Sequence, residues 1–221
     1  MNPWLLDGCK LGWHPRVLAD WMEGHLKAPI YMEIGLAARC NQRCPFCSFS
    51  WTGYDGPLID TQALKQFLES AHRAGLRAIM LAGEGEPTLH PDLEEIVVCA
   101  YDMGLKVSIT TNGVSMSAGL DNLVRYLEFL RFSVNGGNAE AYGWAHGTKG
   151  RNLDRVLENI RQCVEAKRTG GYECTIGVSS VALSETIDSL PSLAAQVQAL
   201  GVDYYMVKVF TAHPRQTDSA L

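Results

Sequence analysis

Three closely spaced cysteines are the residues of this chain best suited to metal chemistry. Cys40, Cys44 and Cys47 follow one another with Cys-x3-Cys-x2-Cys spacing. Three thiolates this close can converge on one soft metal centre, whereas structural zinc and the common four-cysteine iron–sulfur sites take four protein ligands. Because no fourth cysteine is near in the sequence, the spacing favours an iron–sulfur cluster with one iron left open.

The other cysteines do not extend this group. The chain has seven cysteines, an odd number, and its beginning lacks the basic region of a signal peptide, so a disulfide framework is not expected. Cys99 and Cys163 lie beside apolar helical stripes and Cys174 opens a predicted strand, so we expect all three to be buried packing residues. Cys9 lies in the N-terminal extension, residues 1–28, whose aromatic residues we expect to cover one end of the fold.

Composition limits the classes of function. The 221 residues are 47% hydrophobic, which is typical of a globular protein with its own core. A net charge of -5 and a pI near 5.7 argue against a basic nucleic-acid surface or binding to an anionic membrane. No apolar run reaches the ~18 residues of a membrane span. The sequence therefore predicts a cytoplasmic protein with no membrane partner.

Helices and strands that could position the cysteines alternate from residue 58 onward. Asp60 is a predicted N-cap, Pro91 is predicted to open the next helix, and a later apolar stripe runs from Leu153 to Val164. Glycines fit the left-handed position between helix and strand at Gly75, Gly104 and Gly201. The predicted strands are near-continuous apolar runs, which is typical of strands covered on both faces, and they span residues 31–37, 79–82, 107–111, 130–134, 175–181 and 204–207.

Polar residues follow the carboxyl end of each predicted strand, with Cys40 after the first. A ring of such residues describes a barrel mouth, whereas an open doubly wound sheet concentrates its site at one switch point. About six units are too few to close the usual eight-stranded barrel. The sequence predicts an α/β fold, a partial (β/α)6 TIM-like barrel of parallel strands. The later strand-end residues are Gly83, Glu84, Gly85, Glu86, Thr111, Asn112, Gly113, Ser133, Asn135, Ser179 and Lys208.

The cysteine motif, with Phe46 before its third cysteine, resembles the signature of the radical S-adenosylmethionine (SAM) enzyme superfamily. Gly83-Glu84-Gly85-Glu86-Pro87 is similar to the glycine–glutamate SAM-binding segment of that superfamily, and Thr111-Asn112-Gly113 and Ser133-Val134-Asn135 resemble its next two strand ends. The resemblance covers roughly residues 30 to 210, with the motifs in the family's order.

The resemblance implies a ligand set and a cofactor cradle. Cys40, Cys44 and Cys47 would hold three irons of a [4Fe-4S] cluster, and the amino and carboxylate groups of SAM would chelate the fourth. The backbone from Gly83 to Glu86 would line the SAM amino group, because glycines allow close approach. The other implied SAM contacts are Thr111, Asn112, Ser133, Asn135 and Ser179, with Phe46 near the adenine. His146, Lys149 and Arg151 are without a clear match to the basic residue that the family often places near the SAM carboxylate.

The implied activity is reductive cleavage of SAM to a 5′-deoxyadenosyl radical, which abstracts hydrogen from an unidentified substrate. A low-potential electron donor, such as flavodoxin or ferredoxin, would be the redox partner. The resemblance also divides the chain into an extension at 1–28, a core barrel at 29–212 and a polar tail at 213–221. Many relatives continue beyond this point, so the tail could begin a C-terminal region with auxiliary-cluster cysteines.

Two other classes of function fit part of the motif. Cys40, Cys44 and Cys47 could complete a zinc site with a histidine such as His90, which would give a zinc-stabilised binding module. Cys44 and Cys47 alone are spaced like the redox pair of a thiol-disulfide oxidoreductase. That reading leaves Cys40 and the strand-end motifs unexplained.

Overall fold

The computed structural model describes residues 12–25, 28–53, 55–115, 119–148 and 150–211. Six parallel strands form one sheet in the order β1-β2-β3-β4-β5-β6, so chain order and spatial order agree. The strands are β1 (Tyr31–Ile34), β2 (Ala78–Leu81), β3 (Lys106–Thr111), β4 (Leu127–Ser133), β5 (Thr175–Ala182) and β6 (Tyr204–Val209). Each neighbouring pair is parallel and β1 and β6 form the edges, which confirms the predicted partial barrel.

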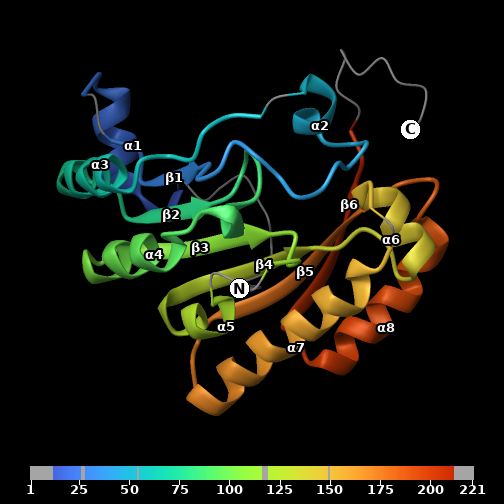
Figure 1. Cartoon of the computed structure of the whole chain (residues 1–221). Coiled ribbons are helices and arrows are strands. Elements are labelled where there is room, and N and C mark those ends of the chain that lie inside the picture. The colour runs from blue at the N-terminus through green and yellow to red at the C-terminus, as the bar shows by residue number, and fades with distance from the viewer. Residues whose placement is uncertain (1–11, 26–27, 54, 116–118, 149, 212–221) are drawn as a thin grey trace.

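Helices connect successive strands, and Figure 1 shows the sheet curling from β1 round to β6. The α-helices are α1 (Pro15–Met22), α2 (Ser48–Thr52), α3 (Thr61–Ala74), α4 (Leu93–Asp102), α5 (Leu120–Leu123), α6 (Ala139–His146), α7 (Asn152–Gly170) and α8 (Leu190–Leu200). Short 3-10 helices are η2 (Pro87–Leu89), η3 (Val124–Tyr126) and η4 (Ile187–Ser189). None of the helices in the described ranges is long and apolar enough to cross a membrane.

Local signals set the ends of several elements. The Asp60 carboxylate accepts a hydrogen bond from the Ala63 N–H at 2.7 Å, as an N-cap does, and α3 begins at the next residue. Gly75, Gly104 and Gly201 all have positive φ and end helices before strands, as predicted. The prediction for Pro91 was wrong by two residues, since Asp92 stands at the N-cap of α4 and the helix begins at Leu93.

The core lies mainly on one face of the sheet. Residues on β2, β3 and β4 alternate between buried and half-buried or exposed, and the buried set packs with the helices. The expectation that strands are covered on both faces was therefore wrong for most of the sheet, although β5 has five buried residues in succession. At the edge, β6 is half-buried at first and exposed at its end, where Val209 is 88% exposed. An unclosed barrel leaves its inner face and edges without a covering layer.

The N-terminal extension does not cover the fold in its described part. Helix α1 has no buried residue, and Trp13 and Trp21 are 67% and 69% exposed. In Figure 1, α1 appears on the same side of the view as α3, away from α2. Cys9 and the rest of residues 1–11 lie outside the described residues, as does the predicted tail from 213.

One leucine and one valine position test where the core lies. Leu130 on β4 is fully buried, so Leu130→Ala should lower the free energy of unfolding by about 2–5 kcal/mol through lost burial and a residual cavity. Val209→Ala on β6 should change it by less than about 1 kcal/mol, because Val209 is already in water. Urea unfolding followed by circular dichroism measures both. Equal losses of unfolding free energy in the two variants would contradict this placement of the core.

Candidate active site at the carboxyl ends of the strands

The three clustered cysteines lie on the loop that connects β1 to the short helix α2. All three are free and half-buried, and Cys47 stands at the N-cap of α2. Their side chains line one cavity of about 100 Å³, together with Gly83 and Gly85 from the loop after β2. The structure therefore brings together two motifs that are separated by more than thirty residues in the sequence.

The arrangement of these cysteines does not suit a single zinc ion. Tetrahedral zinc with Zn–S bonds of about 2.3 Å brings its sulfurs to about 3.8 Å from one another. Within the described part of the chain, the sulfurs of Cys40, Cys44 and Cys47 do not all lie within 4.8 Å of one another. The proposed fourth ligand is also engaged, since His90 Nε2 lies 2.9 Å from the Ile59 carbonyl oxygen and Nδ1 accepts from the Asp92 N–H. A wider centre with more than one metal atom fits the three thiols better.

The protonation of the thiols argues against a thiol-disulfide oxidoreductase. Burial is the main cause that raises the pKa of the Cys44 thiol and of the Cys40 thiol. Charge repulsion from Cys47 and Cys40 adds to the shift of Cys44, and repulsion from Glu86 and Cys47 adds to that of Cys40. Redox-active cysteines need the opposite shift, because the thiolate is the nucleophile. Thiols of this kind give up their protons to a bound metal, since the thiolate is the ligand.

The loop after β2 approaches the backbone that leads into the cysteine loop. The Glu86 N–H donates to the Arg39 carbonyl oxygen at 2.9 Å, next to Cys40. Gly85 has φ +74°, and a Cβ at this position would overlap the carbonyl oxygens of Ala37 and Arg39. Only glycine permits both the left-handed backbone and this close contact.

The Glu86 carboxylate is tied to the protein on both oxygens. Its Oε1 accepts from the Thr88 N–H and hydroxyl and from the Thr111 hydroxyl, and its Oε2 accepts from the Asn112 N–H at 2.7 Å. Glu86 is 2% exposed, so burial raises the pKa of its carboxyl while these hydrogen bonds act to lower it. The side chains of Glu86 and Thr111 therefore join the ends of β2 and β3. Glu84, in contrast, is exposed.

The end of β3 contacts the cysteine loop through Asn112. Its Nδ2 donates to Asn41 Oδ1 at 2.6 Å and lies 3.8 Å from the Cys40 sulfur, while its Oδ1 accepts from the Val114 N–H. Asn112 is thus the strand-end residue, among those predicted, whose side chain reaches the cysteine loop most directly. It orients the segment that carries Cys40.

The remaining predicted SAM contacts lie at the ends of β4 and β5 and on the cysteine loop. Asn135 is fully buried, and its Oδ1 accepts from the Val181 N–H at 2.7 Å, so its side chain ties the end of β4 to β5. Ser133 and Ser179 are register partners on these strands, half-buried and 7% exposed respectively. Phe46 is half-buried on the cysteine loop.

Sequence reasoning missed a buried network behind the cysteines. Gln42, 3% exposed, donates from Nε2 to the Tyr142 hydroxyl at 2.9 Å, and its Oε1 lies 2.8 Å from His146 Nδ1. Burial lowers the pKa of His146 to about 3, so the imidazole is neutral near pH 7. No local pattern signals contacts that span a hundred residues, and a glutamine between two cysteines is the only hint.

The basic residues considered as partners of the SAM carboxylate differ in their location and burial. His146 is 1% exposed with both ring nitrogens engaged inside the protein, which leaves none for a ligand carboxylate. Arg151 is exposed at the start of α7, and Lys149 lies outside the described residues.

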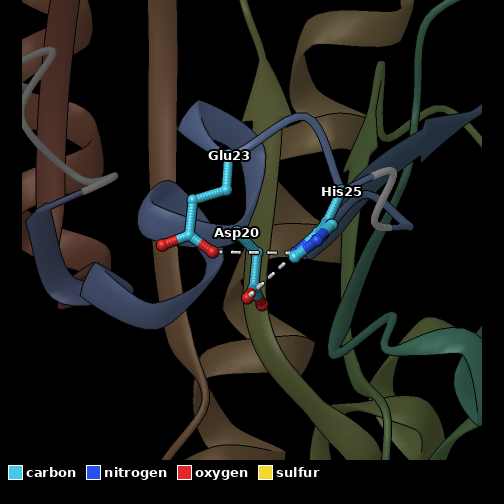
Figure 2. Close-up of side chains that lie close together, drawn as sticks. All are labelled: Asp20, Glu23 and His25. Atoms are coloured by element: carbon cyan, nitrogen blue, oxygen red, sulfur yellow. Dashed lines mark ion pairs between the residues drawn. The ribbon is translucent and has the colours of Figure 1, made fainter.

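A second group of metal-type side chains lies on the surface near α1. Figure 2 shows the carboxylates of Asp20 and Glu23 beside the His25 ring, with Nδ1 to oxygen distances of 4.0 and 3.8 Å. His25 and Glu23 are more than 60% exposed in their side chains. Exposed charges of this kind contribute little binding energy, and the group is separate from the cysteine cavity.

Comparison with known proteins decides the family. The model of the radical SAM superfamily matches residues 34–190, which include the cysteine loop and strands β2 to β5. The chain belongs to the radical SAM superfamily. The family implies SAM and an iron–sulfur cluster as cofactors.

Individual relatives of this radical SAM chain carry different names. It is 29% identical over 183 residues to the tungsten-containing aldehyde ferredoxin oxidoreductase cofactor-modifying protein of Pyrococcus furiosus, covering 80% of this chain and 50% of that protein. It is 29% identical over 189 residues to the PqqA peptide cyclase of Methylobacterium nodulans, covering 80% and 45%. A probable GTP 3',8-cyclase of Halobacterium salinarum is 32% identical over 143 residues, covering 61% and 39%.

Solved structures support the fold. Streptococcus suis SuiB bound to S-adenosylmethionine superposes with a TM-score of 0.73 at 17% identity, over 93% of this chain and 46% of SuiB. The enzyme anSMEcpe with bound AdoMet gives 0.62 at 14% identity, over 82% and 51%. The chain spans about half the length of these relatives, and its likeness to the solved structures is one of fold.

Two glycines of the loop after β2 give a matched test of how the cysteine loop is held. Gly85→Ala should abolish iron–sulfur assembly, because the added methyl group collides with backbone that leads directly to Cys40. Gly83→Ala should retain assembly, since its nearest neighbour is the flexible Glu33 side chain at 3.3 Å, and should lose about 1 kcal/mol of stability through its φ of +88°. Iron and sulfide per chain after anaerobic reconstitution measure the difference. Full assembly in Gly85→Ala would contradict the contact.

Proposed function

We propose that this radical SAM enzyme binds one [4Fe-4S] cluster through Cys40, Cys44 and Cys47 and holds SAM against the loop from Gly83 to Glu86. The observation that supports it most is that these cysteines and two of these glycines line the same cavity. The donor set fits the group, because three soft thiolates leave one iron for an outside ligand. When bound and reduced, the cluster supplies cleavage of SAM to a 5′-deoxyadenosyl radical that abstracts hydrogen from the substrate.

The residues of the chain would bind and orient these cofactors. Backbone carbonyls of Gly83 and Gly85 would accept hydrogen bonds from the SAM amino group, because neither glycine has a side chain to block the approach. The Glu86 carboxylate would act indirectly, since all its hydrogen bonds go to protein donors. Asn112 would hold the Cys40 side of the loop.

The remaining contacts follow from position in the sheet. Ser133 and Ser179, side by side on β4 and β5, would reach the ribose or the methionyl carboxylate. Phe46 would pack near the adenine. A barrel mouth of this kind excludes water from a reactive intermediate once substrate covers it.

Partners follow from the same chemistry. The electron would come from a low-potential donor such as flavodoxin or ferredoxin. The names of the relatives include a peptide and a nucleotide as substrates, and the structure of SuiB has also been solved with its precursor peptide SuiA. The proposal is therefore confined to the chemistry that the core shares, with the substrate unidentified.

Single cysteine replacements test the ligand assignment. Changing Cys40, Cys44 or Cys47 to alanine should abolish both cluster assembly and the formation of 5′-deoxyadenosine from SAM under a strong reductant, because no other thiol in the loop can substitute. Anaerobic wild-type protein should be brown, with iron near four per chain. The measurements are iron and sulfide analysis and chromatography of the SAM products.

Cys99→Ala is the matched control. Cys99 is half-buried beside Lys65 and Glu95 on the surface of α4, which corrects the expectation that it is buried. Its replacement should leave iron content and SAM cleavage near the wild-type values. A colourless wild-type protein that binds zinc stoichiometrically would overturn the proposal, and iron near eight per chain would show that further cysteines are ligands.

A further inference from the structure

The imidazole of His146 lies directly behind the second cysteine of the motif. His146 is the last residue of α6 and is 1% exposed. Its Nδ1 lies 3.5 Å from the Cys44 sulfur and 2.8 Å from Gln42 Oε1. Its carbonyl oxygen accepts from the Arg43 N–H at 3.1 Å, so backbone and side chain of one residue both contact the cysteine loop.

The hydrogen-bond partners determine which nitrogen carries the proton. The Asn135 backbone N–H, which can only donate, points to Nε2 at 3.1 Å. Nε2 must therefore be the acceptor, and the single proton of the neutral ring is on Nδ1. Gln42 then has to present Oε1 to that proton, which leaves its Nε2 to donate to the Tyr142 hydroxyl, as observed at 2.9 Å. A backbone amide on the β4 side thus fixes one N–H at Nδ1, which Gln42 Oε1 at 2.8 Å and the Cys44 sulfur at 3.5 Å share as acceptors.

The position of this N–H is held from several directions. The His146 ring packs against the Tyr142 ring at 4.2 Å between centroids. Gly147 follows with φ +59°, and a Cβ there would overlap the Arg43 carbonyl oxygen, so the end of α6 is in close contact with the loop. The donor cannot be redirected without moving the segment between Cys40 and Cys44.

We propose that His146 is a positioning residue for Cys44. The Nδ1–H of His146, whose shorter hydrogen bond goes to Gln42 Oε1, also donates to the ligand sulfur and raises the reduction potential of the cluster. The inference rests on the proposed function. A thiolate sulfur accepts a hydrogen bond more strongly than a thiol does. Reduction adds one electron from the donor to the cluster, and no bond is made or broken. A hydrogen bond to sulfur stabilises the more negative, reduced state, and therefore favours this electron transfer.

Two isosteric replacements separate the N–H from simple packing. Asparagine places an amide where Nδ1 lies and can keep a donor toward Cys44. Glutamine reaches the position of Nε2, so it can keep the contact with the Asn135 N–H but supplies no donor at Nδ1. His146→Gln therefore removes the donor toward Cys44, and His146→Asn removes the acceptor for the Asn135 N–H. The surface control is Glu140→Gln, on the exposed side of α6.

The experiment is a redox titration of the reconstituted full chain followed by electron paramagnetic resonance, with iron and sulfide content measured on each sample. At a fixed potential, His146→Gln should show up to about a tenfold lower ratio of reduced to oxidised cluster, which corresponds to about 59 mV for one electron. His146→Asn and Glu140→Gln should stay near the wild type. Loss of the cluster in His146→Gln with retention in His146→Asn would equally support a positioning role.

Other outcomes would overturn the inference. These are an unchanged potential in His146→Gln, or equal shifts or equal loss of cluster in the glutamine and asparagine variants. Failure of the proposed function itself would be visible in the wild type, which would then hold no cluster, so the two failures are distinguishable.

Discussion

The buried carboxylate of Glu86 is the interaction on which the rest of the site depends. Burying a carboxylate is costly unless hydrogen bonds replace its lost water, and here donors from Thr88, Thr111 and Asn112 do so. Thr111 and Asn112 lie at the end of β3 and Glu86 lies in the loop after β2, so the carboxylate joins this loop to the end of β3. The Glu86 N–H in turn donates to Arg39, which places the cysteine loop against the same point.

Much of the fold could be predicted from the sequence because its signals are local. Glycines at the helix ends, an aspartate N-cap and apolar strands in regular alternation each act over a few residues, and they gave six strands in the observed order. Burial of the strands was predicted wrongly, since a near-continuous apolar run looks the same whether one face of its strand is covered or both. The Tyr-Tyr-Met-Val run of β6 also looks like that of a central strand. A strand's position at the centre or the edge depends on how the whole sheet is built, and the sequence of the strand alone does not reveal it.

The site was predictable only in part, for the same reason. The cysteines and the glycine segment stood out as motifs, and the structure places them around one cavity. The contacts of the side chains could not be predicted. Three residues that were expected near SAM instead make hydrogen bonds that join strand ends, namely Glu86, Thr111 and Asn135. Gln42 and His146 meet across 104 residues, and only the folded chain shows that one backbone amide orients both.

We propose that three cysteines hold the cluster and leave one iron open for SAM. Electron paramagnetic resonance of the reduced wild-type protein, recorded with and without SAM, tests it most directly. The account predicts that SAM changes the spectrum of the reduced cluster, because its amino and carboxylate groups would become ligands of the open iron. An identical spectrum at a SAM concentration shown to saturate binding would contradict the account.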